Sequence, residues 1–520
     1  MSTTPASCAS PTPGSVSRRS GVCFRATGTC SSCAPPRRAP RRARSGRTST
    51  GSTMRKTKII CTIGPATASY PALASLYEAG MNVVRLNMSH ADHASAARII
   101  NWVKTLNRKV RYPVPILLDT QGPEIRTGDL PTELNLTKGD VITVTVRDQT
   151  DVEATSIHVD YAELVEAVKV GDRITVDNGL VNLEVLAQDG PHLTTRVLDG
   201  GRIGSRRHVN LPGIRVNLPA ITEKDAADID FGVQHEVDFV ALSFVRRAED
   251  VEMLRAHLGR KAGKVKIIAK IEDAEGVENI EDIVRVSDGV MVARGDLGVE
   301  IDIAELPNVQ RRIVRLCQEH GKRSIVATHL LESMIENPIP TRAEATDVAN
   351  AVYEEVDAVM LSGETSVGRH PDRCVGYLDS IARASERHPG LGFARARERD
   401  GEKAHLASAA VVLAESIGAR GIVVITRRGV MADHVTACHP QTVAIYAFTN
   451  DSSTRRRLML NRHLVSHRTA FSQDPEKTLQ TAFRALRARE GFEAEDRVVV
   501  LSDVLAGQGV DAIQVRRIDS

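Results

Sequence analysis

The sequence predicts an α/β protein built from a (β/α)8 TIM barrel, an inserted small β-barrel lid domain and a C-terminal α/β domain. Eight short apolar runs alternate with amphipathic stretches of helical period, which is typical of repeated βα units around a parallel sheet. One gap between these runs is far too long for a βα loop, and further α/β alternation follows the eighth run. A chain of 520 residues also has the length for two or three domains.

The eight barrel strands follow from the apolar runs. We expect them at residues 58–64, 82–88, 114–120, 239–245, 266–272, 289–294, 324–328 and 358–362. Eight parallel strands is the number that closes a TIM barrel. The barrel is therefore assigned to residues 54–125 and 218–387, with its eighth helix ending near Arg387.

The long gap lies between the third and fourth strands and defines an inserted domain, residues 126–217. Segments 141–146, 173–176 and 193–197 are rich in β-branched residues and are separated by Gly-Asp turns. This pattern predicts a small antiparallel β domain, which we expect to form a lid over the mouth of the barrel.

A charged stretch, residues 388–403, follows the barrel and is expected to be a linker. Beyond it, residues 400–520 predict a separate α/β domain. Its helices are expected at 405–417 and 475–490, and its strands at 421–426, 443–448, 497–501 and 512–518.

The first 53 residues differ from the rest in composition. They hold nine Arg and no Asp, Glu or Lys, so the net charge of +3 leaves about 3 − 9 = −6 on the remaining chain. Such a Ser-, Pro- and Arg-rich stretch is expected to be disordered. We interpret it first as a translated upstream stretch before a natural start at Met54, and second as a cleaved targeting segment. A nucleic-acid-binding arm ranks last, because aromatic residues are not interleaved with the arginines.

Composition excludes other classes of protein. No uninterrupted apolar run reaches about 18 residues, so no membrane partner is expected. Eight cysteines in this length make no disulfide framework, and only Cys30 and Cys33 approach zinc-site spacing. We expect a cytoplasmic enzyme with no nucleic-acid partner.

Polar residues at the ends of the predicted strands indicate the active site, because TIM barrels carry their chemistry at the carboxyl ends of the strands. Lys270 and Glu272 alternate to the same side of one strand, and Asp296 follows the next strand. Two carboxylates from adjacent strands suit a hard cation such as Mg²⁺ (or Mn²⁺). A cation beside Lys270 and Arg85 is the electrostatic arrangement that phosphoryl transfer needs.

Long motifs then identify a family resemblance. The sequence KTKIICTIGP begins at Lys56, VRLNMSH at Val84, LDTQGPEIR at Leu118, IAKIE at Ile268 and ARGDLG at Ala293. VNLPG lies at 209–213, between the third and fourth of these motifs, and LESMI, PTRAE and MLSGET lie beyond the last of them. From Arg55 to the C-terminus the chain resembles pyruvate kinase.

The resemblance implies transfer of the phosphoryl group of phosphoenolpyruvate to ADP, giving pyruvate and ATP. It implies that Arg85 and Lys270 hold the phosphoryl group, that Lys270 stabilises the enolate, and that Thr328 lies in the proton relay. Glu272 and Asp296 would bind Mg²⁺. The implied substrate-binding residues are Arg85, Ser243, Lys270, Gly295, Asp296 and Thr328.

The resemblance also implies a K⁺ site and a nucleotide site. The K⁺ ligands would be Asn87, Ser89, Asp119 and Thr120. Family members with Glu at the position of Glu124 tend to require K⁺, whereas those with Lys carry a tethered ammonium, so Glu124 predicts K⁺ dependence. The alternative for Glu124 is a surface carboxylate paired with Arg126. The implied nucleotide contacts are Pro65, His90, Arg126 and Arg207.

Several residues depart from the family pattern. Gln121 stands where many relatives have Lys, His329 replaces a common Gln, and His208 replaces a Gly. The loop 426–433 (TRRGVMAD) lacks the hydroxyl-rich sequence that cradles a sugar bisphosphate, so we expect weak or no activation by fructose 1,6-bisphosphate. Arg427 and Arg428 could serve AMP or a sugar monophosphate instead, or be two solvated arginines. A homotetramer is implied by resemblance alone.

Two other functions compete with the kinase. A Mg²⁺-dependent pyruvate or oxaloacetate aldolase on a related barrel also uses a Glu and an Asp to stabilise an enolate, but Lys270, the lid and the C-terminal domain argue against it. A non-catalytic phosphometabolite-binding regulator would require damage to the lysine or the metal ligands, and these residues are intact.

Overall fold

We describe a computed structural model of the chain, which covers residues 54–130, 132–146, 156–177, 179–214, 216–502 and 512–519. The interpretations of residues 1–53 lie outside this range. None of the described helices is long and apolar enough to cross a membrane.

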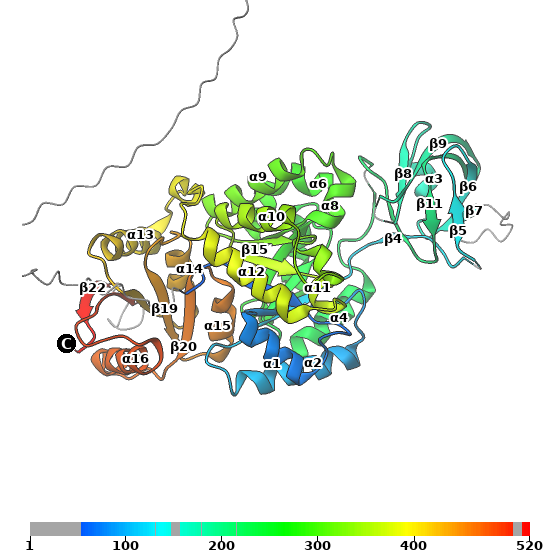
Figure 1. The fold of residues 1–520 in the computed structure, drawn as a ribbon. Coiled ribbons are helices and arrows are strands. Elements are labelled where there is room, and N and C mark those ends of the chain that lie inside the picture. Colours follow the sequence, from blue (N-terminus) through cyan, green and yellow to red (C-terminus); the bar gives the residue numbers. More distant parts are fainter. Residues whose placement is uncertain are drawn as a thin grey trace, which may run out of the picture. The chain divides into compact units, whose positions relative to one another are not determined.

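Eight parallel strands close into a barrel (Figure 1), which confirms the predicted fold class. Going around the barrel, the order is β1-β17-β16-β15-β14-β13-β3-β2, so each strand lies beside its neighbours in the chain. The strands are β1 (Lys58–Thr62), β2 (Val83–Asn87), β3 (Ile116–Asp119), β13 (Phe239–Leu242), β14 (Lys266–Ile271), β15 (Gly289–Ala293), β16 (Arg323–Ala327) and β17 (Ala358–Leu361). All eight lie inside or within one residue of the predicted ranges.

Helices surround the barrel and bury the outer face of its strands. They are α1 (Tyr70–Ala79), α2 (His93–Asn107), α4 (Glu223–Gln234), α5 (Ala248–Leu258), α6 (Ala274–Glu278), α7 (Ile280–Val286), α8 (Arg294–Glu300), α9 (Leu306–Glu319), α10 (Arg342–Tyr353), α11 (Gly363–Ser366) and α12 (Pro371–Ser385). Helix α10 begins at a capping box, in which Thr341 and Glu344 satisfy each other's backbone N–H groups.

The barrel interior is a packed core. Ile60, Leu117, Ile268 and Ile325 belong to one fully buried apolar cluster that fills it. Leu460, from the C-terminal part of the chain, belongs to the same cluster and is itself fully buried. We call the amino ends of the barrel strands the base, and the carboxyl ends, where the polar residues described below gather, the mouth.

The inserted segment forms a seven-stranded sheet of order β4-β12-β8-β9-β10-β6-β7 and a separate two-stranded pair, β11 and β5. An isolated bridge between Thr127 and Val159 joins the two outer strands, as a small β-barrel requires. The elements are β4 (Ile125–Arg126), β5 (Leu134–Leu136), β6 (Val141–Val146), β7 (Ser156–Val159), α3 (Leu164–Ala167), β8 (Arg173–Val176), β9 (Val181–Asp189), β10 (His192–Asp199), β11 (Gly201–Ile203) and β12 (His208–Asn210). The expectation of a purely antiparallel insert is wrong in one place, because β6 and β7 pair in parallel.

The C-terminal part is a five-stranded sheet of order β20-β19-β18-β21-β22. Its elements are α13 (Gly401–Ser416), β18 (Gly421–Ile425), α14 (Val430–Thr436), β19 (Ala444–Thr449), α15 (Ser452–Arg457), β20 (Leu464–Arg468), α16 (Pro475–Glu490), β21 (Arg497–Ser502) and β22 (Ala512–Arg517). The predicted linker is corrected at its end: residues 401–403 already belong to α13, and a 3₁₀ turn occupies Phe393–Ala396.

Candidate active site

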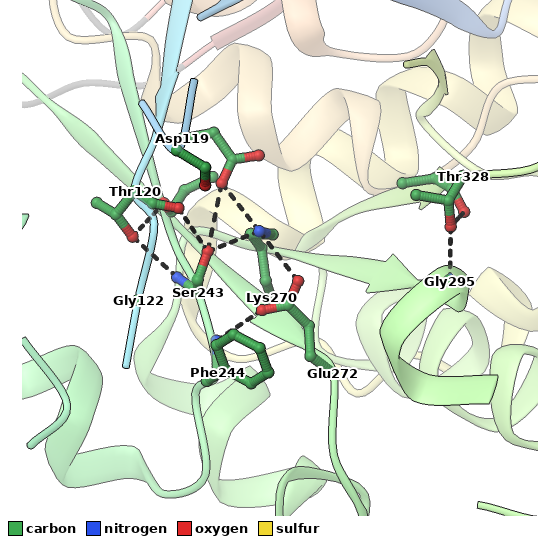
Figure 2. A network of polar contacts seen from close by, with 12 residues as sticks. Asp119, Thr120, Gly122, Ser243, Phe244, Lys270, Glu272, Gly295 and Thr328 are labelled. Carbon is green, nitrogen blue, oxygen red and sulfur yellow. Dashed lines mark hydrogen bonds and ion pairs between the residues drawn. The ribbon is translucent and has the colours of Figure 1, made fainter. Parts of the chain in front are cut away.

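Lys270 is the centre of a buried polar cluster at the mouth (Figure 2). Its Nζ donates to Ser243 Oγ at 2.6 Å and lies 3.0 Å from both Asp119 Oδ1 and Glu272 Oε1. The contact between Lys270 and Glu272 confirms that strand alternation directs both side chains inward. An ammonium group has three donors, so these three partners occupy it completely.

The charges of this cluster determine its protonation. Burial alone would lower the pKa of Lys270, but the carboxylates of Asp119 and Glu272 outweigh it and raise the pKa above its usual value. Burial raises the pKa of Glu272, and the charge of Asp296 adds to this effect, against the opposing influence of Lys270. Lys270 is therefore a permanent cation, and Glu272 is a carboxylate whose charge a further cation would stabilise.

Arg85 on β2 is tied into the same cluster. Its Nε donates to Asp119 Oδ2 at 2.6 Å, and its Nη1 donates to Thr62 Oγ1 at 3.0 Å. In the described part of the chain its Nη2 has no hydrogen-bond partner, so this nitrogen can donate to an anionic substrate. Although Asp119 is fully buried, Arg85 and Lys270 hold its pKa below the usual range.

Thr328 and Gly295 form a second group at the mouth, apart from Lys270 in Figure 2. The backbone N–H of Gly295 donates to Thr328 Oγ1 at 2.7 Å. Thr328 has φ +64° and His329 has φ +55°, so two successive residues adopt the left-handed region. This conformation is a genuine outlier for a β-branched residue, and such strain clusters at functional sites.

Arg294 holds this strained segment and was not predicted as a site residue. Its Nη2 donates to the carbonyl of Thr328 at 2.6 Å, its Nε donates to the carbonyl of Ala327 at 3.2 Å, and its Nη1 pairs with Asp347 at 2.7 Å. Thr62 was missed as well, although it ends the first barrel strand and the rule of a polar residue at each strand end could have found it.

The carboxylates predicted for Mg²⁺ come from adjacent parts of the barrel. Glu272 follows β14, and Asp296 is half-buried on α8, directly after β15. Glu272 Oε2 also accepts from the backbone N–H of Phe244 at 2.7 Å, which fixes its orientation. Within the described residues no group of three or more His, Cys, Asp or Glu side chains forms a metal cluster. A site of two carboxylates suits Mg²⁺, which binds few protein ligands and keeps positions for substrate and water.

The residues predicted for K⁺ lie at the ends of β2 and β3. Asn87 Oδ1 accepts from the N–H of Ser89 at 3.3 Å, and Thr120 Oγ1 lies 3.1 Å from the N–H of Ser243. These oxygens and those of Asp119 are a donor set that fits a monovalent cation. Glu124 forms an ion pair with Arg126, whose Nε lies 2.7 Å from Glu124 Oε2.

The residues predicted for nucleotide binding are more exposed and more dispersed. Pro65 and His90 are exposed on the barrel, and Arg126 lies on β4 of the insert. Arg207 is exposed as well, and its Nη1 lies 3.4 Å from Asp177 Oδ1. The described contacts do not join these four residues to the Lys270 cluster.

Comparison with known proteins decides the family. The family model described as "Pyruvate kinase, barrel domain" matches residues 54–375, and "Pyruvate kinase, alpha/beta domain" matches residues 404–515. The chain belongs to the pyruvate kinase family. Pyruvate kinases are phosphotransferases that transfer the phosphoryl group of phosphoenolpyruvate to ADP, and the chain has the barrel and the α/β domain of this family.

Curated pyruvate kinases are similar over most of the chain. "Plastidial pyruvate kinase 2" of Arabidopsis thaliana is 39% identical over 476 residues, which cover 89% of this chain and 81% of the relative. The pyruvate kinase of Clostridium perfringens is 39% identical over 86% of this chain and 96% of its own length. That of Geobacillus stearothermophilus is 41% identical over 87% of this chain and 78% of its own. These matches do not favour the aldolase or the non-catalytic regulator.

Proposed function

We propose that the chain catalyses the pyruvate kinase reaction with Lys270, Arg85 and Thr328 as its catalytic residues. The observation that carries the proposal is the buried ammonium of Lys270, held between two carboxylates at 3.0 Å beside a guanidinium that keeps a free donor. Positive charge fixed in a buried site stabilises the charge that develops on the transferring phosphoryl group.

The phosphoryl group would bind to Arg85 and Lys270 and replace one of the present partners of the lysine. Lys270 would then stabilise the enolate oxygen as the bond to phosphorus breaks. Thr328 would lie over the enol face and relay a proton to carbon. Ser243, Gly295 and Asp296 would complete the phosphoenolpyruvate site.

Two cations are part of the proposal. Glu272 and Asp296 would hold Mg²⁺ (or Mn²⁺), which supplies positive charge beside the reacting oxygens when it is bound. Asn87, Ser89, Asp119 and Thr120 would hold K⁺. Pro65, His90, Arg126 and Arg207 would contact ADP, the two arginines through its polyphosphate.

We further propose the division into a barrel (54–125 and 218–387), a lid (126–217) and a C-terminal domain (400–520), assembled as a cytoplasmic homotetramer. Exposed apolar side chains such as Ile303, Val367 and Val412 support an oligomer, since each would be covered by a partner. An allosteric role of the C-terminal domain is part of the same proposal.

The decisive assay measures pyruvate released from phosphoenolpyruvate and ADP while Mg²⁺ and K⁺ are varied separately. We expect turnover that requires Mg²⁺ and is strongly increased by K⁺. No pyruvate in the presence of both cations would overturn the proposal.

A further inference from the structure

The first turn of helix α4 contacts two segments at the mouth of the barrel. The segments are residues 87–91, at the end of β2, and residues 119–124, at the end of β3. Strands β2 and β3 pair in parallel with Asn87 opposite Asp119, so the two segments start side by side. Together they carry the four residues proposed to hold K⁺. Contacts that fix the two segments therefore also fix the spacing of the K⁺ ligands.

Lys224 holds the first of these segments. Its Nζ donates to the backbone carbonyl of Met88 at 2.7 Å. Met88 is buried and stands between Asn87 and Ser89. The N–H of His90 donates to the carbonyl of Asn87 at 3.3 Å, which closes a turn around Met88. The lysine thus anchors a turn that carries two of the proposed ligands.

A buried carboxylate compensates the charge of Lys224. The ammonium also donates to Asp228 Oδ2 at 2.7 Å, one helical turn further along α4. The other oxygen of Asp228 lies 2.7 Å from Nε2 of His93, the first residue of α2. Asp228 therefore directs the lysine toward Met88 and offsets a charge that would otherwise repel a cation nearby.

Asp225 holds the second segment. Its side chain is fully buried, and Oδ1 accepts from the backbone N–H of Gly122 at 3.1 Å. The other oxygen, Oδ2, accepts from the hydroxyl of Thr222 at 2.7 Å and from the backbone N–H of Thr222 at 3.1 Å. One oxygen of Asp225 thus belongs to the capping box of α4, whereas the other binds a distant part of the chain.

The segment bound by Asp225 is packed closely against Ser243. Gly122 has φ +79°, and a Cβ at this position would lie 2.7 Å from Ser243 Cβ. Thr120 contacts the same serine (Figure 2): its Oγ1 accepts from the N–H of Ser243 at 3.1 Å, and its carbonyl accepts from Ser243 Oγ at 2.7 Å. The bond between Gly122 and Asp225 therefore helps to keep Thr120 in place.

We propose that Lys224 and Asp225 are positioning residues of the monovalent-cation site. This inference rests on the proposed function, in which oxygen atoms of the two segments hold K⁺. Successive residues of a helix point about 100° apart, so two neighbours on α4 can each reach a different segment. Neither side chain touches the ion. Each acts through the backbone next to a ligand, and the loss of such outer hydrogen bonds typically weakens ion binding about 10- to 100-fold.

The first test measures activation by K⁺ of pyruvate formation at saturating Mg²⁺, phosphoenolpyruvate and ADP. In Lys224→Met the K⁺ concentration for half-maximal activation should rise about tenfold, because the anchor of the Met88 carbonyl is lost. Turnover at saturating K⁺ and the Mg²⁺ requirement should stay close to those of the parent. Lys224→Arg keeps a cationic donor and should restore most of the affinity for K⁺.

Asp225→Ala and Thr222→Ala form a matched pair. Both remove contacts of the capping box of α4, but only Asp225→Ala also removes the acceptor for Gly122. Both should lower the unfolding temperature, since an N-cap is lost. Only Asp225→Ala should raise the half-activating K⁺ concentration, again about tenfold. An equal rise in the two variants would reduce Asp225 to a helix cap and contradict its role in the site.

The second test measures ion binding without turnover. Thermal unfolding is followed at increasing KCl, with tetramethylammonium chloride keeping the ionic strength constant. An ion that binds only the folded chain raises its stability according to the ratio of ion concentration to Kd. The KCl concentration that gives the same rise in unfolding temperature should therefore be about tenfold higher in Lys224→Met and Asp225→Ala. It should be unchanged in Thr222→Ala.

The inference and the proposed function fail in different ways. No pyruvate from the parent chain with both cations would overturn the proposed function, while the thermal test would still decide the roles of Lys224 and Asp225. Unchanged K⁺ responses of Lys224→Met and Asp225→Ala would overturn the inference alone. A K⁺ and a Mg²⁺ requirement that rise together in Lys224→Met would also overturn it, since the damage would then extend beyond the K⁺ site. A parent chain whose unfolding temperature does not respond to K⁺ would remove the site and the inference with it.

Discussion

The two ends of the barrel carry positive charge in opposite ways. At the mouth, Lys270 lies between two carboxylates and Arg85 is paired with Asp119. At the base, Lys322, Arg397, Arg428 and Arg457 have no carboxylate partner in the described part of the chain, although they line one cavity. The charges at the mouth are thus paired with neighbouring carboxylates, whereas these four cations at the base are not.

The largest effect is expected for Lys270→Met at the mouth. We expect turnover to fall on the order of 10³-fold or more, because one buried charge directed at the transition state is worth several kcal/mol. Steady-state kinetics of pyruvate formation would measure it. Lys264→Met, an exposed lysine just before β14, is the matched control and should keep its turnover. A tenfold loss or less in Lys270→Met would mean that the role of the lysine is wrongly assigned.

A second prediction concerns the junction of barrel and C-terminal sheet. Glu490, at the end of α16, accepts from the Tyr112 hydroxyl at 2.9 Å and pairs with Arg111 at 2.7 Å. Burial opposes ionisation, but hydrogen bonds from His467, Arg111 and Tyr112 lower the pKa of Glu490 to about 2. The carboxylate therefore contributes stability above its ordinary pKa of 4.5, and this contribution is lost as the pH falls toward 2.

Urea unfolding of Glu490→Gln tests that prediction. The variant should lose about 2 kcal/mol at pH 7, the magnitude of a hydrogen-bonded charge, and the difference from the parent should shrink below pH 4.5. Glu493→Gln, an exposed neighbour, should change the free energy of unfolding little. A difference that stays constant from pH 7 to pH 3 would contradict the assigned pKa.

The smallest expected effect concerns the second cation at the mouth. Glu124→Lys should reduce the activation by K⁺ about tenfold, because a tethered ammonium would take the place of the ion. Glu124→Gln removes the ion pair with Arg126 without supplying an ammonium, so it should remain dependent on K⁺. Turnover measured with and without K⁺ would decide this, and unchanged K⁺ activation in Glu124→Lys would remove Glu124 as the determinant.

The barrel could be predicted from sequence because each βα unit repeats a strong local pattern. Strand alternation likewise placed Lys270 and Glu272 on one side of β14. The parallel pairing of β6 and β7 could not be predicted, since it depends on contacts between distant segments. The short strand β20 and helix α15 were missed, because Leu464–Arg468 and Ser452–Arg457 are too polar to give an apolar run.

The contacts around the candidate site could not be predicted from the sequence. Arg294 carries no signal of its own, because its role depends on the carbonyl of Thr328 coming from a different strand. The cluster of cations at the base could not be predicted either. Lys322, Arg397 and Arg457 are far apart in the chain, and only the fold brings them to one cavity.

The left-handed backbone at Thr328 places stability and activity in conflict, because the residue that suits the backbone best is not the one that supplies the hydroxyl. A non-glycine residue in this region costs on the order of 1–3 kcal/mol, and glycine would remove that cost. Threonine supplies instead a hydroxyl that accepts from Gly295. A library at position 328 that is selected for thermal resistance should therefore drift toward glycine, while one selected for turnover should return threonine.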